Sequence, residues 1–386
     1  MSQSQSQIKE KADINWINMV LFTTTPLLAV SIVPVYGYNH GYDTFEWSVF
    51  FILLVFCGMS ITAGYHRLWS HKTYHAHPIL RFIFALGGAC ALQNDILHWA
   101  SDHRRHHQFV DNNEKDPYSA KRGFWFSHIG WILRNYRSGK EDLSNVKDLT
   151  SDPIVRFQHQ HYLKLVLLTN IGLPTILGLI HGDVAGSLLL GGVLRLVLSQ
   201  HSTYLINSAA HIWGRQPYSN SSTARDNTFL ALLTYGEGYH NYHHTFQWDY
   251  RNGNRWWHYD PTKWLIRFLS IAGITKGLKT CSPAIVETAK LQKQYLDATD
   301  KCKLLKISEN WQICLEEEYH QFANTLKTWS EHHKVFFESK KLATLGKLEK
   351  LEFRKKSREL KVKLRDHRRR WAQMIENLGH PVYVAH

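Results

Sequence analysis

Residues 47–71 of the 386-residue chain read WSVFFILLVFCGMSITAGYHRLWSH, an apolar run that ends in His66-Arg67-Leu68-Trp69-Ser70-His71. The run from Trp47 to Tyr65 approaches the roughly 20 apolar residues that a helix needs to cross a bilayer. Two histidines follow directly, where the run leaves the apolar layer. This stretch therefore predicts a membrane helix with two histidines at one end.

Other apolar segments extend this pattern to four predicted spanning helices, at about residues 16–36, 47–65, 163–181 and 184–206. Short loops at 37–46 and 181–184 join them into two hairpins and contain no Lys or Arg, whereas residues 66–162 contain many. By the positive-inside rule, both termini and this central section face the cytoplasm. We expect an all-α integral membrane fold with a cytosolic helical cap, in a bacterial inner membrane or in the endoplasmic reticulum of a eukaryote.

A fifth apolar run, from Ile79 to Leu97, contains Arg81, Asn94 and Asp95. If it crossed the membrane, the histidines on its two sides would lie on opposite faces. We therefore predict that residues 79–97 lie in the interface or re-enter the membrane. Arg195, inside the fourth span, is costly there unless it faces protein or reaches the interface.

Composition and charge limit the possible classes of protein. The net charge is +14 and 44% of the residues are hydrophobic, and the long apolar runs argue against a nucleic-acid-binding protein. A basic surface suits an anionic membrane face or an anionic substrate headgroup. The five cysteines form no CxxC pair and are expected to be reduced thiols, and the polar N-terminus does not read as a signal peptide.

The chain changes character near residue 280, so we predict a membrane domain at 1–280 and a charged helical tail of unknown role at 281–386. Large apolar residues recur at helical spacing in the tail: Trp311, Leu315, Tyr319, Phe322, Leu326 and Trp329. The favoured interpretation is a helical hairpin packed on the cap. A membrane-surface contact and a docking face for a redox partner remain alternatives.

Three histidine clusters follow apolar segments: His66 and His71, then His103, His106 and His107, then His211, His240, His243 and His244, with Asn207 four residues before His211. In the spacing HxxHH, positions i, i+3 and i+4 lie on one helix face, so each motif can direct three imidazoles into one site. On an ideal α-helix, His66 and His71 would point about 140° apart. They are therefore expected to straddle a site or to end a helix.

Nine imidazoles exceed the three or four protein ligands of one zinc ion, so we predict two metal ions. Imidazole suits Fe, Zn, Cu and Ni alike. Hydrophobic volume beside the cluster favours iron and O2, because zinc has no redox chemistry with which to attack C–H bonds. Asn207 could hold a metal-bound water, and Glu237 and Asp102 could orient imidazoles or form salt bridges of the cap.

Other histidines lack such partners in the sequence. We expect them to be ordinary polar or interfacial residues, and none is predicted as a ligand: His75, His77, His98, His128, His159, His161, His181, His201 and His258.

Between about residues 16 and 275 the chain resembles the membrane fatty acyl desaturases, in the acyl-CoA delta-9 (stearoyl-CoA-type) branch. The resemblance rests on the strings GYHRLWSHKTYHAH, LQNDILHWASDHRRHH, DPYSAKRGFWFSHIGW, NSAAHIWG and GEGYHNYHHTFQWDYRNG. It implies a four-span fold whose cytosolic cap holds two Fe²⁺ ions. It also implies that the nine clustered histidines are the ligands and that Asn207 acts through water.

The resemblance further implies a kinked hydrophobic tunnel for the acyl chain. Gln93, Trp99 and Thr203 match positions that shape the kink, Leu54 and Gly58 match the region that limits its depth, and Asn94 and Asp102 match contacts to the thioester headgroup. Ser101 replaces a common Arg, and Tyr204 replaces an expected Trp. Acyl-CoA, acyl carrier protein and an intact lipid therefore remain open as carriers of the chain.

The implied reaction is O2-dependent insertion of a cis double bond, at the delta-9 position, into a long-chain acyl thioester. The chain has no HPGG motif of a fused cytochrome domain. Electrons are therefore expected from a separate ferredoxin-like or cytochrome-like protein that docks on the basic surface. A lipid or alkane hydroxylase with the same di-iron chemistry is the alternative enzyme, and a non-catalytic membrane metal-binding protein is the alternative outside enzymes.

Overall fold

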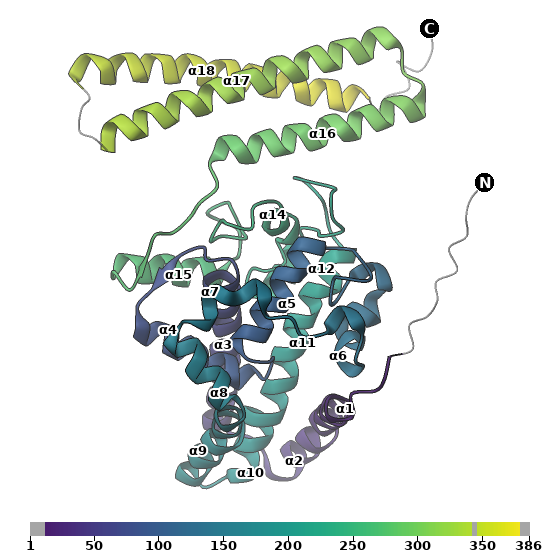
Figure 1. Cartoon of the computed structure of the whole chain (residues 1–386), viewed down its shortest axis with the longest axis vertical. Coiled ribbons are helices and arrows are strands. Elements are labelled where there is room, and N and C mark those ends of the chain that lie inside the picture. Colours follow the sequence, from purple (N-terminus) through teal and green to yellow (C-terminus); the bar gives the residue numbers. More distant parts are fainter. Residues whose placement is uncertain (1–11, 342–345, 379–386) are drawn as a thin grey trace. The chain divides into compact units, whose positions relative to one another are not determined.

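A computed structural model describes residues 12–341 and 346–378, and they form two compact helical units (Figure 1). The first unit contains residues up to Gln216 together with Ser221–Thr280. The second contains Pro217–Asn220 and the residues from Cys281 onward. Each unit is described by itself below.

In the described part of the first unit, four helical rods are long and apolar enough to cross a membrane, as predicted. Each extends beyond its predicted bounds: the rods cover Trp16–His40, Thr44–Ser70, Pro153–His181 and Val184–Ile212. Their component helices are α1 (Trp16–Val30), α2 (Ile32–His40), α3 (Thr44–Met59), η1 (Ser60–Ser70), α8 (Pro153–Leu167), η6 (Leu168–Gly172), α9 (Leu173–His181), α10 (Val184–Ser187), η7 (Leu188–Leu194), α11 (Arg195–Asn207) and α12 (Ala209–Ile212).

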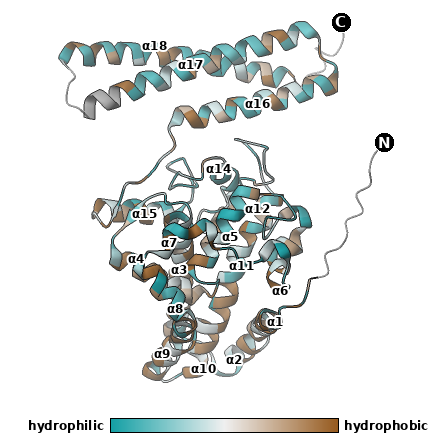
Figure 2. Ribbon diagram, in the orientation of Figure 1, coloured by the Kyte–Doolittle hydropathy of each residue, from teal (hydrophilic) through white to brown (hydrophobic). Residues whose placement is uncertain are grey.

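The outer faces of these rods are apolar and exposed. Ile17 is 82% exposed and Ile180 is 75% exposed, and Figure 2 shows hydrophobic colour concentrated on α2, α9 and α10. Contiguous apolar surface of this kind is rare on proteins surrounded by water. The rods therefore present the surface that a bilayer would cover.

Aspartate caps explain where several helices begin. The Asp43 side chain accepts hydrogen bonds from backbone N–H groups of the first turn of α3, and Glu46 completes a capping box. Asp95 accepts from the N–H groups of Leu97 and His98 and so starts α5 (Ile96–Phe109). This cap fixes the start of the helix that carries the HRRHH motif.

The helix η1 is a π-helix, and this corrects the predicted angle between His66 and His71. Its backbone follows the i→i+5 pattern, which continues in a 3.1 Å hydrogen bond from the His71 N–H to the His66 carbonyl. A residue five positions later therefore returns to nearly the same face. The two imidazole centroids lie 4.8 Å apart, so both side chains enter one site.

The fifth apolar run forms two helices, α4 (Pro78–Ala91) and α5, which meet at an angle of 81°. The break contains two residues with left-handed backbone, Leu92 at φ 50° and Asn94 at φ 76°. This bend agrees with the predicted re-entrant or interfacial run. It turns α5, which carries the HRRHH motif, away from the axis of α4. Gly88 lets α4 approach η1, because a Cβ there would stand 2.1 Å from the Tyr65 ring.

Arg195 faces protein within the fourth rod. Its side chain is completely buried, and the guanidinium donates to the carbonyls of Gly191 and Cys90 at 2.9 and 2.7 Å. It also donates to Oδ1 of Asn170 at 3.0 Å. These oxygens replace the water that the charge would lose in the membrane.

Shorter elements complete the first unit: η2 (Ala120–Arg122), η3 (Phe126–Gly130), α6 (Trp131–Leu133), η4 (Arg137–Gly139), η5 (Ser144–Val146), α7 (Lys147–Thr150), α13 (Thr228–Leu233), α14 (His240–Thr245) and α15 (Pro261–Ile271). The strands β1 (His75–Ala76) and β2 (Thr275–Lys276) pair antiparallel, with His75 opposite Lys276. This pairing ties the segment after η1 to the segment after α15.

The second unit consists of α16 (Pro283–Leu305), α17 (Glu309–Lys341) and α18 (Lys347–Asn377), with an apolar core of its own. The predicted apolar stripe of α17 lies in this core, where Leu315, Phe322 and Leu326 are at most 4% exposed. The described residues of this unit therefore form three helices instead of the predicted hairpin. Because its own helices cover the stripe, that face is not free for a membrane or a redox partner.

Candidate metal centre

The nine predicted histidine ligands gather at one place in the first unit, in two groups. Within each group the ligand nitrogens lie within 4.8 Å of one another. The first group is His66, His71, His103, His107 and His243, and the second is His106, His211, His240 and His244. In both HxxHH motifs, the histidines at i and i+4 join one group and the histidine at i+3 joins the other.

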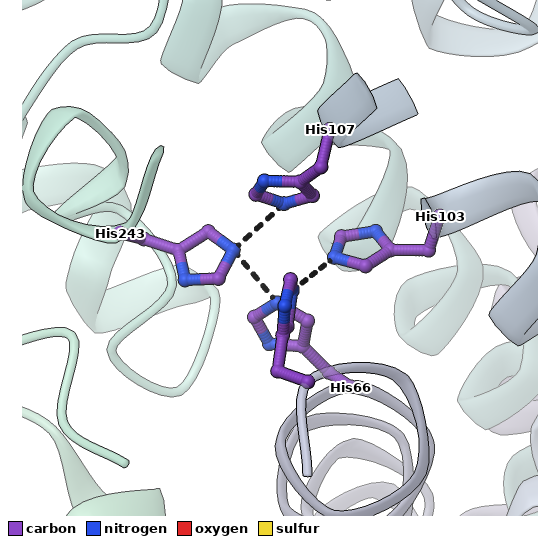
Figure 3. Close-up of side chains that lie close together, drawn as sticks. His66, His103, His107 and His243 are labelled. Atoms are coloured by element: carbon purple, nitrogen blue, oxygen red, sulfur yellow. Dashed lines mark hydrogen bonds between the residues drawn. The ribbon is translucent and has the colours of Figure 1, made fainter. Parts of the chain in front are cut away.

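The spacing of the ring nitrogens fits metal ligation. Nε2 of His243 lies 3.0 Å from Nε2 of His66 and 2.9 Å from Nε2 of His107 (Figure 3). In the second group, Nε2 of His240 lies 3.1 Å from Nε2 of both His211 and His244. Two nitrogens bound about 2.1 Å from one metal ion are about 3.0–3.4 Å apart. Each group therefore has the donor set and the spacing of a metal site.

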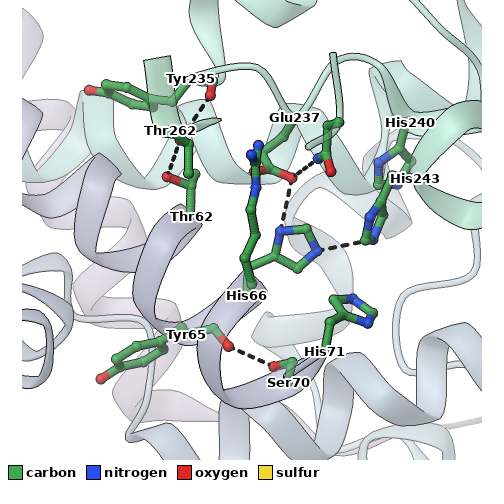
Figure 4. Close-up of polar contacts among 12 residues, drawn as sticks. Thr62, Tyr65, His66, Ser70, His71, Tyr235, Glu237, His240, His243 and Thr262 are labelled. Atoms are coloured by element: carbon green, nitrogen blue, oxygen red, sulfur yellow. Dashed lines mark hydrogen bonds and ion pairs between the residues drawn. The ribbon is translucent and has the colours of Figure 1, made fainter. Parts of the chain in front are cut away.

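The far nitrogens of several rings are held by other side chains. Nδ1 of His66 lies 2.9 Å from Oε2 of Glu237 (Figure 4), and Nδ1 of His106 lies 2.9 Å from Oδ1 of Asp116. A carboxylate at Nδ1 keeps the proton there and leaves Nε2 free to bind a metal. The sequence suggested Glu237 for such a role. Asp116 was missed, and only its position inside the string DPYSAKRGFWFSHIGW could have drawn attention to it.

Asp102 pairs instead with the guanidinium of Arg105, one turn later on α5. A further support missed in the sequence is Thr223, whose hydroxyl lies 2.9 Å from Nδ1 of His211 and donates to Asp111. The loop that carries Thr223 has no motif that would have pointed to this contact.

Burial keeps most of these imidazoles neutral. Loss of water, and then the charge of neighbouring imidazoles, lowers the pKa well below 6.5 for His71, His103, His107, His243 and His244. The same causes lower the pKa of His240 to about 3. Burial alone would raise the pKa of Glu237, but His66 and Arg67 outweigh it and lower it to about 2. Neutral imidazoles supported by an ionised carboxylate are the states that metal ligation requires.

Acidification from pH 7 to pH 5 is expected to destabilise the metal-free protein. The pKa of His240 is about 3 in the folded chain and about 6.5 in an unfolded chain. The unfolded state therefore binds more protons in this window, and stability is lost as the pH falls below 6.5. His240 alone contributes about 2 kcal/mol of this loss at pH 5.

Thermal unfolding of the apoprotein in detergent, measured at stepped pH, checks this expectation. The variant His240→Gln should show a shallower decline than the unaltered chain. A midpoint that is constant or higher at pH 5 contradicts the prediction.

A cavity of about 550 Å³ adjoins both histidine groups. Its lining includes His66 and His103 from the first group and His240 from the second. Five of the predicted substrate residues also line it: Gln93, Asn94, Trp99, Asp102 and Thr203. Asn207 lines the same cavity, beside the histidines, and its action through water stays a prediction.

Two contacts shape this cavity near the histidines. The Gln93 amide donates to the Thr203 hydroxyl at 2.9 Å and so joins the α4–α5 break to α11. The Trp99 ring stacks on the His103 ring, with centroids 4.9 Å apart and planes at 23°. An apolar wall therefore touches a candidate metal ligand directly.

Leu54 and Gly58, both in the described part of the chain, are not among the residues that line this cavity. The open side of Gly58 is filled by the ring of Tyr235, which stands 2.2 Å from the position of a Cβ. The Tyr235 hydroxyl donates to the Leu54 carbonyl at 3.1 Å.

Gly58→Ala is therefore expected to destabilise the protein by about 1–3 kcal/mol, because the added methyl overlaps the half-buried Tyr235 ring. Chemical or thermal unfolding measures the change. The double variant Gly58→Ala with Tyr235→Val, which removes the overlapping ring, should recover part of the loss. An unchanged midpoint in Gly58→Ala would contradict this packing.

Three histidines set aside in the sequence lie beside carboxylates. Nδ1 of His98 and Nδ1 of His159 lie 2.7 and 3.0 Å from Oδ2 of Asp95. His181 lies close to the carboxylates of Asp43 and Glu46. The hydrogen bond to Asp95 raises the pKa of His98 to about 9, and it outweighs burial, which alone would lower that pKa. His98 is thus held mainly as a cation in an ion pair.

Comparison with known proteins places this geometry in a family. A family model described as fatty acid desaturase matches residues 45–269. Acyl-CoA desaturase 1 of Saccharomyces cerevisiae is 40% identical over 299 residues, which are 77% of this chain and 57% of that relative. Stearoyl-CoA desaturase 5 of Homo sapiens is 38% identical over 286 residues, which are 73% of this chain and 86% of that relative.

Delta(9)-fatty-acid desaturase fat-7 of Caenorhabditis elegans is 38% identical over 294 residues, which are 74% of this chain and 85% of that relative. The chain spans only 57% and 65% of the lengths of the Saccharomyces cerevisiae protein and of the probable acyl-CoA desaturase of Schizosaccharomyces pombe. The matched region contains all nine histidines of the two groups. The family model covers more than half of the chain. The chain belongs to the fatty acid desaturase family.

Proposed function

We propose that this protein is an O2-dependent fatty acyl desaturase that inserts a cis double bond, at the delta-9 position, into a long acyl chain. The observation that carries the proposal is the cavity of about 550 Å³ lined by histidines of both metal-binding groups. Its volume lies within the range of about 300–1,000 Å³ that is usual for ligand sites. A substrate in this cavity would lie beside both groups.

The nine histidines would hold two iron ions, five side chains facing one ion and four facing the other. When bound, the iron pair would supply the redox chemistry that activates O2 against C–H bonds. The carboxylates of Glu237 and Asp116 keep the protons of His66 and His106 on Nδ1 and hold both rings in place.

The cavity residues would position the substrate. Trp99 presents an apolar wall next to His103. The hydrogen bond between Gln93 and Thr203 would fix the bend of the substrate cavity next to this wall. A rigid wall of this kind selects which methylenes of a flexible chain lie next to the metal ligands. Apolar residues of the lining such as Ile61 and Leu92 would limit the access of bulk water to the reacting carbons.

The relatives carry names that specify acyl-CoA or stearoyl-CoA. We propose acyl-CoA as the substrate form, with Asn94 and Asp102 near its headgroup because both line the cavity. The metal centre would face the cytoplasm, as the distribution of Lys and Arg in the loops indicates. A separate ferredoxin-like or cytochrome-like protein would deliver the electrons.

Expression in a host that requires unsaturated fatty acids tests the reaction and its position together. Growth without supplement, and lipids with two hydrogens fewer and a double bond at carbon nine, support the proposal. Lipids that instead gain one oxygen would identify a hydroxylase. If the chain is expressed, folded and loaded with iron and the lipids of the host are unchanged, both enzyme activities are contradicted. The variant His103→Ala serves as the inactive control.

A further inference from the structure

A second cluster of ligand-type side chains lies at the end of the rods opposite the histidine centre. The rod Thr44–Ser70 carries His66 near its C-terminal end. At its N-terminal end, Asp43 is the helix cap and Glu46 lies in the first turn. The rod Val184–Ile212 carries His211 near its end and begins beside Asp183. His181 and Asp183 belong to one short connector, and Asp43 belongs to the other.

Both aspartates use one oxygen as a helix cap and keep the other available. Oδ1 of Asp43 accepts from the N–H of Phe45 at 2.7 Å, while Oδ2 lies 3.0 Å from Nε2 of His181. Oδ1 of Asp183 accepts from the N–H of Gly186 and from the hydroxyl of Tyr36, at 2.8 and 2.7 Å. Helix capping therefore does not account for the second oxygens.

The free oxygen of Asp183 meets a buried oxygen of Glu46. Oδ2 of Asp183 and Oε1 of Glu46 stand 2.2 and 2.0 Å from the position that a Cβ would take on Gly186, so the two oxygens adjoin. Glu46 is only 2% exposed, and within the described residues its Oε1 has no hydrogen-bond partner. Its other oxygen accepts from the N–H of Asp43 at 2.8 Å.

Two adjoining carboxylates cannot both stay ionised without a cation between or beside them. Neither connector contains Lys or Arg that could serve as that cation. A proton shared between Glu46 and Asp183 would also satisfy this oxygen pair, and the experiment below distinguishes it from a bound cation. The ligand atoms of Asp43, Glu46 and His181 also lie within 4.8 Å of one another, and Asp43 and His181 are partly exposed. Solvent therefore reaches a site with three carboxylates and one imidazole.

We propose that Asp43, Glu46, His181 and Asp183 bind a divalent cation that ties the two interhelical connectors together. Carboxylates suit Mg²⁺, Ca²⁺ and Mn²⁺, and the added imidazole favours a transition metal such as Mn²⁺ or Zn²⁺ over Ca²⁺ and Mg²⁺. The cation would neutralise the acidic cluster and fasten the α2–α3 turn to the α9–α10 turn. The site is independent of the proposed desaturation.

Mn²⁺ is the probe for this site, because paramagnetic resonance distinguishes free from bound ion. The full-length, iron-loaded protein in detergent is titrated with Mn²⁺ alongside the variants Glu46→Gln and His181→Gln. The unaltered chain should bind one Mn²⁺ and unfold at a higher temperature when it is bound. Each variant should bind Mn²⁺ at least about tenfold more weakly, since each loses a direct ligand.

The matched control is Glu141→Gln, which removes a 64% exposed carboxylate outside this cluster and should behave as the unaltered chain. Iron content is measured after each titration, so that exchange at the histidine centre is recognised. Equal Mn²⁺ binding by the unaltered chain and both variants overturns the proposal. So does a lack of any Mn²⁺ response together with full stability of Glu46→Gln, which is the result that a shared proton between Glu46 and Asp183 would give.

Discussion

The variant His103→Ala is expected to lose most of its iron and at least about 100-fold of its desaturase activity. His103 supplies one of the five imidazoles of the first group, and its Nε2 lies 2.8 Å from Nε2 of His71. Loss of residues that only support a ligand already costs about 10–100-fold in metal affinity or activity, so loss of a ligand should cost more. The ring also stacks on Trp99, so the substitution removes a contact between the metal site and the cavity wall.

Two measurements follow the loss of metal and the loss of activity. Iron per chain is determined by elemental analysis, and double-bond formation is determined by mass spectrometry of the lipids. The matched control is His75→Ala, because His75 is exposed in β1 and belongs to neither metal-binding group. If His103→Ala retains two irons and full activity, the assignment of the first group is wrong.

The gathering of these nine histidines could be predicted, because it follows largely from their helical spacing. Positions i, i+3 and i+4 share a helix face, so the three imidazoles of each HxxHH motif point toward one region, although they divide between the two groups. All nine of the predicted histidines lie in the two groups. The division into groups could not be predicted, since it depends on how α5 and α14 face each other. That arrangement places His107 with His243 and His106 with His244.

The π-helical winding at His66 and His71 could not be predicted from the sequence, for a different reason. The same residues can wind as an α-helix or as a π-helix, and the packing around them decides which winding forms. Every residue of η1 is buried, so tertiary contacts outweigh the intrinsic preference for α-helical winding. The change of winding converts two diverging side chains into neighbours whose centroids lie 4.8 Å apart.

Supporting residues were hardest to foresee because they lie far from their partners in the sequence. Glu237 was suggested only because it lies beside the ligand His240, yet it contacts His66. His181 belongs to no histidine cluster in the sequence, and Asp43 and Glu46, which adjoin it in the structure, come from the other hairpin. A pattern search along one chain cannot detect pairs that only the fold brings together.

Arg67→Met is expected to destabilise the protein by about 3–5 kcal/mol, because it leaves two buried carboxylates without their cation. Arg67 is 1% exposed and donates to Oε1 of Glu237 at 2.8 Å and to Oδ2 of Asp260 at 3.1 Å. It also donates to the Tyr250 carbonyl at 2.9 Å. Glu237 and Asp260 are 2% and 0% exposed, so water cannot replace the guanidinium.

The loss should extend to the metal centre, because Glu237 also holds Nδ1 of His66. Without the charge of Arg67, the pKa of Glu237 rises from about 2, and the carboxylate loses the donor that holds its Oε1. Arg67→Met should therefore unfold at a lower temperature and also bind iron more weakly. Arg255→Ala, at an exposed position, serves as the control for loss of an arginine.

A triple variant separates the buried charge from the loss of packing. Adding Glu237→Gln and Asp260→Asn to Arg67→Met removes the carboxylates that were left unpaired, so part of the lost stability should return. Iron binding should not return with it, since the amide introduced by Glu237→Gln holds Nδ1 of His66 less strongly than a carboxylate does. If Arg67→Met unfolds at the same temperature as the unaltered chain, the buried ion pairs do not support the metal site. Recovered stability without recovered iron is the combination that the contacts of Glu237 require.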